Sequence, residues 1–113
     1  KVFSYAEGRD VDTGLQFCGL IMGDHAKSGI NTMFNTGTVV GVAANVFGSG
    51  FPPKHIPSFS WGGAEGLSHH DPGRALVTAR RVMERRGVHM NTAEESVLHT
   101  VAATERQRLE PGA

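Results

Sequence analysis

The sequence predicts a mainly β protein: a parallel β-helix of six-residue (hexapeptide) repeats with a capping loop over residues 1–66, followed by two α-helices in an extension over residues 67–113. Three observations predict it. A six-residue period runs from Met22 to Phe51. Twelve of the fifteen glycines and all eight aromatic residues lie in the first 66 residues. Helix start and stop signals follow in the remainder of the chain.

Composition limits the classes of protein that fit. The 113 residues include 11 basic and 11 acidic side chains, so a net charge of zero argues against binding to nucleic acid or to an anionic membrane. A single cysteine excludes an internal disulfide, and no run of about 18 apolar residues is present to span a membrane. The start shows no signal-peptide pattern, so we expect a cytoplasmic protein. A chain this short buries only roughly 65% of its unfolded surface, which favours oligomerisation. From the predicted β-helix, whose apolar edges are too short to close alone, we expect a homotrimer.

The six-residue period divides the chain into five units. The first position of each unit is mostly apolar, the second is glycine in three of five units, and the fifth is always small. In a triangular coil an apolar residue fills the interior of each edge, a small residue fits near the corner, and Gly or Asn supplies the backbone angles of the corner. An antiparallel β-domain with glycine turns is the alternative, but apolar and polar residues do not alternate strictly. The units are Met22–Lys27, Ser28–Met33, Phe34–Val39, Val40–Asn45 and Val46–Phe51.

Two helices are expected after the repeats. Asp71 and Pro72 form a good helix start, an apolar stripe follows, and Gly87 is a natural stop. A second helix is expected from Thr92, with Glu95 three residues on at the spacing of a capping box.

Part of the chain resembles a known family. Residues 13–63 resemble the left-handed β-helix of sugar-1-phosphate nucleotidyltransferases, and the stretches Asn31–Gly41 and Pro57–Gly63 carry most of the likeness. The helices, including the run Arg80–Arg86, fit the end of a bacterial family of sugar nucleotidyltransferases. That family is related to the bifunctional uridylyltransferase and acetyltransferase that makes UDP-N-acetylglucosamine.

The resemblance implies that the chain is the C-terminal β-helix portion of a sugar-phosphate nucleotidyltransferase. In such enzymes an N-terminal Rossmann-like domain with a glycine-rich loop and a Mg²⁺ site carries out nucleotidyl transfer. This sequence has no G-x-G-x-x-G motif and no acidic pair that we can place for Mg²⁺. We therefore expect the chain to be inactive alone, with a sugar phosphate or sugar nucleotide as the ligand of the full-length enzyme.

Two alternatives come from the acetyltransferase half of the bifunctional relative, which works as a trimer with acetyl-CoA. Ile30 stands where that relative has its catalytic histidine, and Met33 replaces a tyrosine that touches the sugar. Isoleucine cannot accept a proton, so acetylation by the known mechanism is in doubt. The alternatives are an acyl-CoA-dependent sugar acyltransferase domain that uses other residues, or a non-catalytic trimerisation module.

Four polar residues of the repeats are candidates for such a site. His25 lies in the middle of a unit and is the candidate catalytic base, acting in a site shared with a neighbouring subunit. The simpler interpretation is a solvent-facing or interface histidine. Lys27 is a candidate ligand for a phosphate or carboxylate. Asn31 and Asn35 are candidates for hydrogen bonds to a sugar, although such residues more often satisfy the backbone at turns.

The segment Phe51–Gly63 supplies the remaining candidates. Lys54 and His55 follow two prolines and are the best loop candidates for ligand contact. We expect the segment mainly to cap the open end of the repeats with its apolar side chains. A metal site at His69–Asp71 is not expected, because no third distant ligand is specified.

Overall fold

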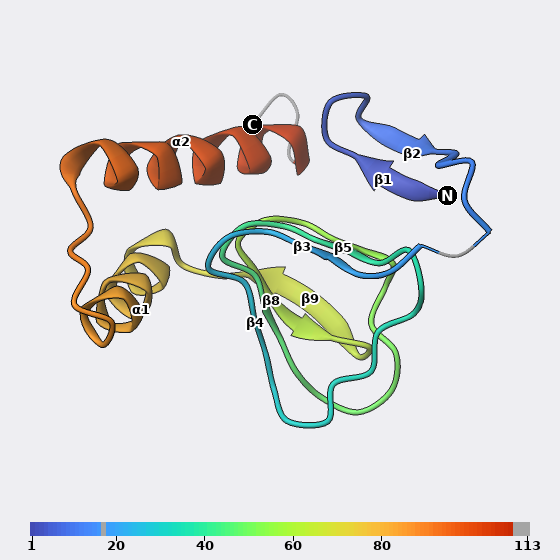
Figure 1. Ribbon diagram of the computed structural model, residues 1–113, viewed down its shortest axis with the longest axis horizontal. Helices are drawn as coiled ribbons and strands as arrows, with labels where there is room; N and C mark the ends of the chain where they lie inside the picture. The colour runs from blue at the N-terminus through green and yellow to red at the C-terminus, as the bar shows by residue number, and fades with distance from the viewer. Residues whose placement is uncertain (17, 110–113) are drawn as a thin grey trace.

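The computed structural model describes residues 1–16 and 18–109, so residue 17 and the last four residues of the expected helical extension lie outside the described residues. Within these described residues, nine short strands precede two helices; Figure 1 shows the two helices beside the strands. The strands are β1 (Val2–Ser4), β2 (Arg9–Val11), β3 (Ile21–Met22), β4 (Lys27–Ser28), β5 (Val39–Val40), β6 (Asn45–Val46), β7 (His55–Ile56), β8 (Ser60–Gly63) and β9 (Gly66–His69). The helices are α1 (Pro72–Glu84) and α2 (Thr92–Leu109).

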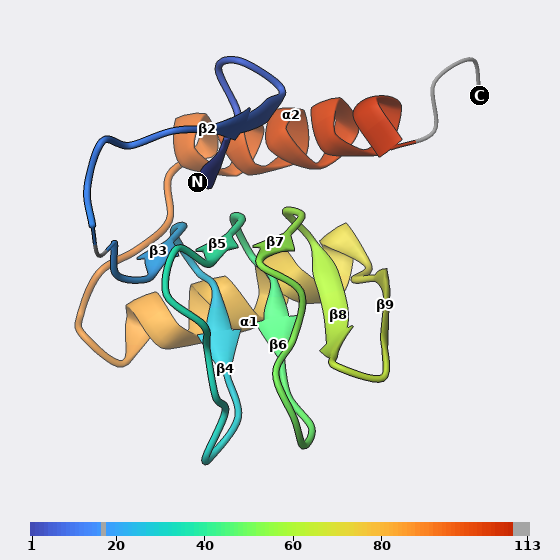
Figure 2. The same cartoon turned by 90° about the vertical axis from the view of Figure 1, so that its right-hand side faces the viewer.

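The strands form three small sheets. β1 and β2 make an antiparallel hairpin, β3-β5-β7 form a parallel sheet, and β4-β6-β8-β9 form a sheet in which only β9 is antiparallel. Figure 2 shows the last two sheets one above the other, with β3 and β4 at the same end. Ile21 of β3 pairs with Val39 of β5, and Lys27 of β4 pairs with Asn45 of β6, so these partners lie three six-residue units apart in the sequence.

The prediction of a mainly β fold, a left-handed parallel β-helix, is wrong. The sheets are short and mixed, with antiparallel pairs at β1-β2 and β8-β9, and no solenoid of parallel repeats is evident in the described residues. Helices contribute 13 and 18 residues and supply much of the core. The physical reason is that strands of two residues bury too little surface alone, so the helices must cover them. The protein is therefore a mixed α and β structure.

The core divides into two clusters. One lies between the short parallel strands and contains Val40, Ala44, Val46 and Ile56. The other joins the strands to both helices and contains Ala43, Phe59, Ala75, Leu76, Leu98 and Ala102. The segment Phe51–Gly63 does not cap a β-helix: Ile56 lies in β7 and Phe59 packs against the helices, both buried, whereas Phe51 and Trp61 are exposed.

The glycines at the second position of the repeats, Gly23, Gly29 and Gly41, do not supply left-handed corner angles, and Gly23 and Gly41 instead allow close approach of the backbone. A Cβ on Gly23 would lie 2.9 Å from the backbone of Gly41 and Val42, and a Cβ on Gly41 would overlap the backbone of Ser58. The left-handed backbone occurs instead at the fourth position of the units, where φ is 61° at His25, 60° at Asn31, 75° at Gly37 and 56° at Ala43. The expected role of the second-position glycines is therefore corrected: the next strand passes too close for a side chain.

Both predicted helices are present. Asp71 caps the start of α1 by accepting a hydrogen bond from the backbone N–H of Arg74 (3.1 Å). Gly87, with φ 72°, lies in the turn that follows the end of this helix. The capping box of α2 lies one residue earlier than predicted. The Asn91 side chain accepts the backbone N–H of Glu94, and the Glu94 side chain accepts the backbone N–H of Asn91. Neither helix is long and apolar enough to cross a membrane, among the residues described.

Candidate functional site

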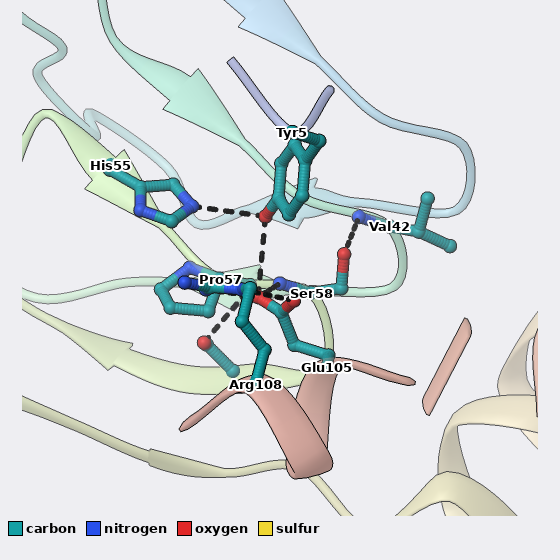
Figure 3. A network of polar contacts seen from close by, with 8 residues as sticks. Tyr5, Val42, His55, Pro57, Ser58, Glu105 and Arg108 are labelled. Carbon is teal, nitrogen blue, oxygen red and sulfur yellow. Dashed lines mark hydrogen bonds and ion pairs between the residues drawn. The ribbon is translucent and has the colours of Figure 1, made fainter. Parts of the chain in front are cut away.

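A buried carboxylate lies at the centre of a polar network (Figure 3). Glu105 on α2 is only 4% exposed, and its Oε1 accepts hydrogen bonds from the backbone N–H of Ser58 (3.1 Å) and from Nη2 of Arg108 (2.9 Å). Nε of Arg108 donates to the other oxygen, Oε2, at 3.0 Å. A buried carboxylate needs such partners, because an unpaired charge in the interior costs several kcal/mol, on the order of 3–5.

Tyr5 and His55 extend this network to the N-terminal hairpin. The Tyr5 hydroxyl donates to Oε1 of Glu105 at 3.4 Å, and it lies 3.0 Å from Nε2 of His55. Because a phenol has one hydrogen, the Tyr5 oxygen then accepts the Nε2–H of His55. The ring of Phe3 stacks on His55 with 3.6 Å between centroids. These contacts orient the imidazole.

Burial sets the protonation of the two rings. It lowers the pKa of the His55 imidazole, and the positive charge of Arg108 lowers that pKa further. Burial raises the pKa of the Tyr5 phenol, and the nearby Glu105 carboxylate adds to the rise. At neutral pH both rings are therefore uncharged. The Glu105 oxygens already have protein partners, so the network joins the hairpin, β7 and α2 as a structural connection.

An apolar groove of about 410 Å³ begins at this network. It lies between β3 and β5 on one side and α2 on the other, lined by Ile21, Met22, Val39 and Val101, with Tyr5 among its lining residues. It is within the size range of small-molecule sites, roughly 300–1,000 Å³.

The structure brings two of the predicted site residues together. His25 and Lys27 line one recess of about 130 Å³ between the β4-β6-β8 sheet and α1, with Asn45, Trp61 and His70; we call it the basic recess. His25 has φ 61°, a conformation that costs energy in a residue other than glycine.

The other predicted residues do not join it. Asn31 is exposed at a turn with φ 60°, and Asn35 is exposed while its carbonyl accepts bonds from the N–H and hydroxyl of Thr38. The Lys54 ammonium donates to the carbonyl oxygen of Lys1 at 3.4 Å. Its neighbour His55 belongs to the polar network.

Sequence reasoning missed Tyr5, Glu105 and Arg108 in the network, and Asn45 and His70 in the basic recess. Asn45 carried a signal, since it lies three units after Lys27 and pairs with it. Tyr5 and Glu105 are separated by 100 positions, and no local pattern joins them. No group of three or more His, Cys, Asp or Glu residues placed to hold a metal ion occurs within residues 1–16 and 18–109.

Comparison with protein-family models, with curated proteins and with solved structures gave no match for this chain.

Proposed function

We propose that this chain is the C-terminal part of a sugar-phosphate nucleotidyltransferase and serves there as an association module that brings three copies together. Membership of that class comes from the resemblance of Asn31–Gly41 and Pro57–Gly63. Both stretches contribute to the interior, since Val40, Ser58 and Phe59 are buried. The proposal places the protein in the cytoplasm, which cell fractionation tests.

One observation supports association: an apolar edge formed by Ile21, Met22 and Ile30. β3 and β4 are both edge strands at the same end of their sheets (Figure 2). Ile21 on β3 is 49% exposed, and Ile30 after β4 is 95% exposed. An open strand edge with apolar side chains is a template for pairing with another chain.

The proposed occupant of the apolar edge is a second copy of the chain. Eleven basic and eleven acidic side chains leave no net charge, so copies do not repel one another as a strongly charged protein does. Three copies are proposed because the acetyltransferase half of the related bifunctional enzyme works as a trimer.

Sedimentation equilibrium tests the assembly. We expect a mass three times the 12.1 kDa of the chain. Ile30→Lys places a charge in the proposed contact and should give monomers at micromolar concentration. Val77→Lys, on an exposed part of α1, is the matched control and should leave the assembly intact. A monomeric unmodified chain at these concentrations, or equal behaviour of the two variants, contradicts the proposal.

The enzymatic part needs a separate assay. The chain alone should release no pyrophosphate from a nucleoside triphosphate and a sugar 1-phosphate in the presence of Mg²⁺. The protein expressed from the reading frame extended upstream of Lys1 should do so. A frame that encodes no nucleotide-binding domain contradicts membership of this enzyme class. Calorimetric titration with acetyl-CoA tests the acyltransferase alternative, for which binding is required.

A further inference from the structure

The basic recess brings cationic, amide and imidazole groups together from separate parts of the chain. Lys27, Asn45 and Trp61 form a row across β4, β6 and β8, because Lys27 pairs with Asn45 and Asn45 with Trp61. Paired residues of neighbouring strands project to the same side of a sheet. His25 comes from the turn before β4 and His70 from the segment after β9.

The ammonium of Lys27 is available to a ligand. Its Nζ donates one hydrogen bond, to the carbonyl oxygen of His25 at 3.3 Å, and an ammonium has two further hydrogens. No carboxylate of the described residues forms an ion pair with it. The recess has no Asp or Glu among its described lining residues, while Asp24 and Glu94 line a separate recess that shares His25.

The walls of the recess are held in place before any ligand arrives. Nδ1 of His70 lies 3.2 Å from the carbonyl oxygen of Ala43, and a carbonyl only accepts, so Nδ1 carries the hydrogen. The imidazole of His70 also lies against Trp61, with ring centroids 5.0 Å apart. Groups fixed in this way lose little entropy on binding.

We propose that the basic recess binds a phosphate group, either free phosphate or the phosphate end of a sugar phosphate. The recess, of about 130 Å³, is far smaller than the roughly 300–1,000 Å³ of sites for drug-sized molecules, and this size suits one compact oxyanion. Donors that approach from β4, β6 and the turn before β4 suit the several oxygens of a tetrahedral anion. This proposal does not depend on the proposed function.

Trp61 is the protein's single tryptophan and lies in the wall of the recess, so its fluorescence reports on binding there. Titration with inorganic phosphate should give a saturable change in Trp61 emission that sodium chloride at equal ionic strength does not give. Lys27→Gln should weaken binding about tenfold or more, because a charge-assisted hydrogen bond is lost. Lys54→Gln removes a lysine outside the recess and should bind phosphate as the unmodified protein does. An unsaturable change, or equal weakening by both variants, overturns the proposal.

A second measurement needs no variant. In ¹H–¹³C spectra of the unmodified protein, phosphate should move the imidazole signals of His25 and His70 and leave those of His89 and His99 in place. Movement of all four signals alike overturns the proposal. A hexose 1-phosphate that binds at least tenfold tighter than inorganic phosphate identifies a sugar phosphate as the occupant. Equal or weaker binding identifies the free anion, and acetate binding tighter than both contradicts a phosphate site.

Discussion

The hydroxyl of Tyr5 lies 3.0 Å from Nε2 of His55, and this contact joins residues 50 positions apart. It attaches the β1-β2 hairpin to β7, while Glu105 attaches both to α2 (Figure 3). Two ends of the chain therefore meet at one buried carboxylate. Within residues 1–16 and 18–109 the hairpin makes no strand pair with the other sheets, so side-chain contacts such as this network and the stacking of Phe3 on His55 fix its position.

Glu105→Gln tests that dependence. The variant keeps the size of the side chain but removes the charge that faces Arg108, so we expect the free energy of unfolding to fall by about 1–3 kcal/mol. Urea unfolding followed by circular dichroism measures it. Glu65→Gln removes an exposed carboxylate from the β8-β9 turn and should change stability by less than about 0.5 kcal/mol. Equal effects of the two substitutions contradict a central role for Glu105.

The lowered pKa of His55 predicts a pH-dependent stability. Burial and the charge of Arg108 lower this pKa, while Glu105 and Asp10 oppose the shift, and Tyr5 bonds the ring. The unfolded chain, with a histidine pKa of about 6.5, therefore binds a proton more readily than the folded protein. The stabilisation is present above about pH 6.5 and is lost as the pH falls toward the folded-state pKa.

The measurement is urea unfolding at several values between about pH 7.5 and 5. The unmodified protein should lose stability across this interval, and His55→Gln should show a flatter profile. His89→Gln, an exposed control, should retain the dependence of the unmodified protein. If His55→Gln keeps the full slope, another group is responsible for it.

Gly41→Ala tests the close approach of neighbouring strands. A Cβ at this position would overlap the backbone nitrogen of Ser58, a buried residue, so we expect a loss of about 1–3 kcal/mol or more. Gly19→Ala is the matched control, because a Cβ there meets nothing within 4 Å and the backbone is not left-handed. Thermal melts should separate the two variants by several degrees, and coincident melts would show that the strands can move apart.

The repeat period predicted the interior better than it predicted the fold. Val40 and Val46, at the first position of their units, and Ala44, at the fifth, are buried as the pattern indicates, whereas Met22, at the first position of its unit, is exposed. The period reflects which side chains turn inward, so the sequence predicts that feature directly. The period does not indicate how many residues of each strand pair or which elements cover the strands. Phe59 packs against Ala75 and Leu98 of the helices, and this long-range contact makes the protein a mixed α and β structure.

The same contrast applies to the candidate sites: the repeat pattern predicts some of their residues, whereas contacts between residues distant in the sequence are not predictable from it. The sequence predicts Lys27 as a candidate ligand residue from its place in a unit, and its pairing with Asn45 follows from the six-residue period. Tyr5 and Glu105 form a hydrogen bond although they lie 100 positions apart, and neither their residue types nor their spacing predicts it. The sequence favours His25 and Asn31 for their chemistry, and the structure shows that both have a left-handed backbone at the fourth position of their units.

The start of α2 provides a direct test between sequence and structure. The sequence favours Thr92 and Glu95 as the capping box, whereas in the structure the Asn91 side chain accepts the N–H of Glu94 at 2.8 Å and Glu94 accepts the N–H of Asn91. Asn91→Ala should therefore cost about 1 kcal/mol in urea unfolding. Thr92→Ala, at the first helical residue, should be neutral or slightly stabilising, because alanine has the higher helix propensity. A larger loss of stability in Thr92→Ala than in Asn91→Ala would mean that Thr92 is the N-cap residue, since only the N-cap side chain satisfies a free N–H of the first turn.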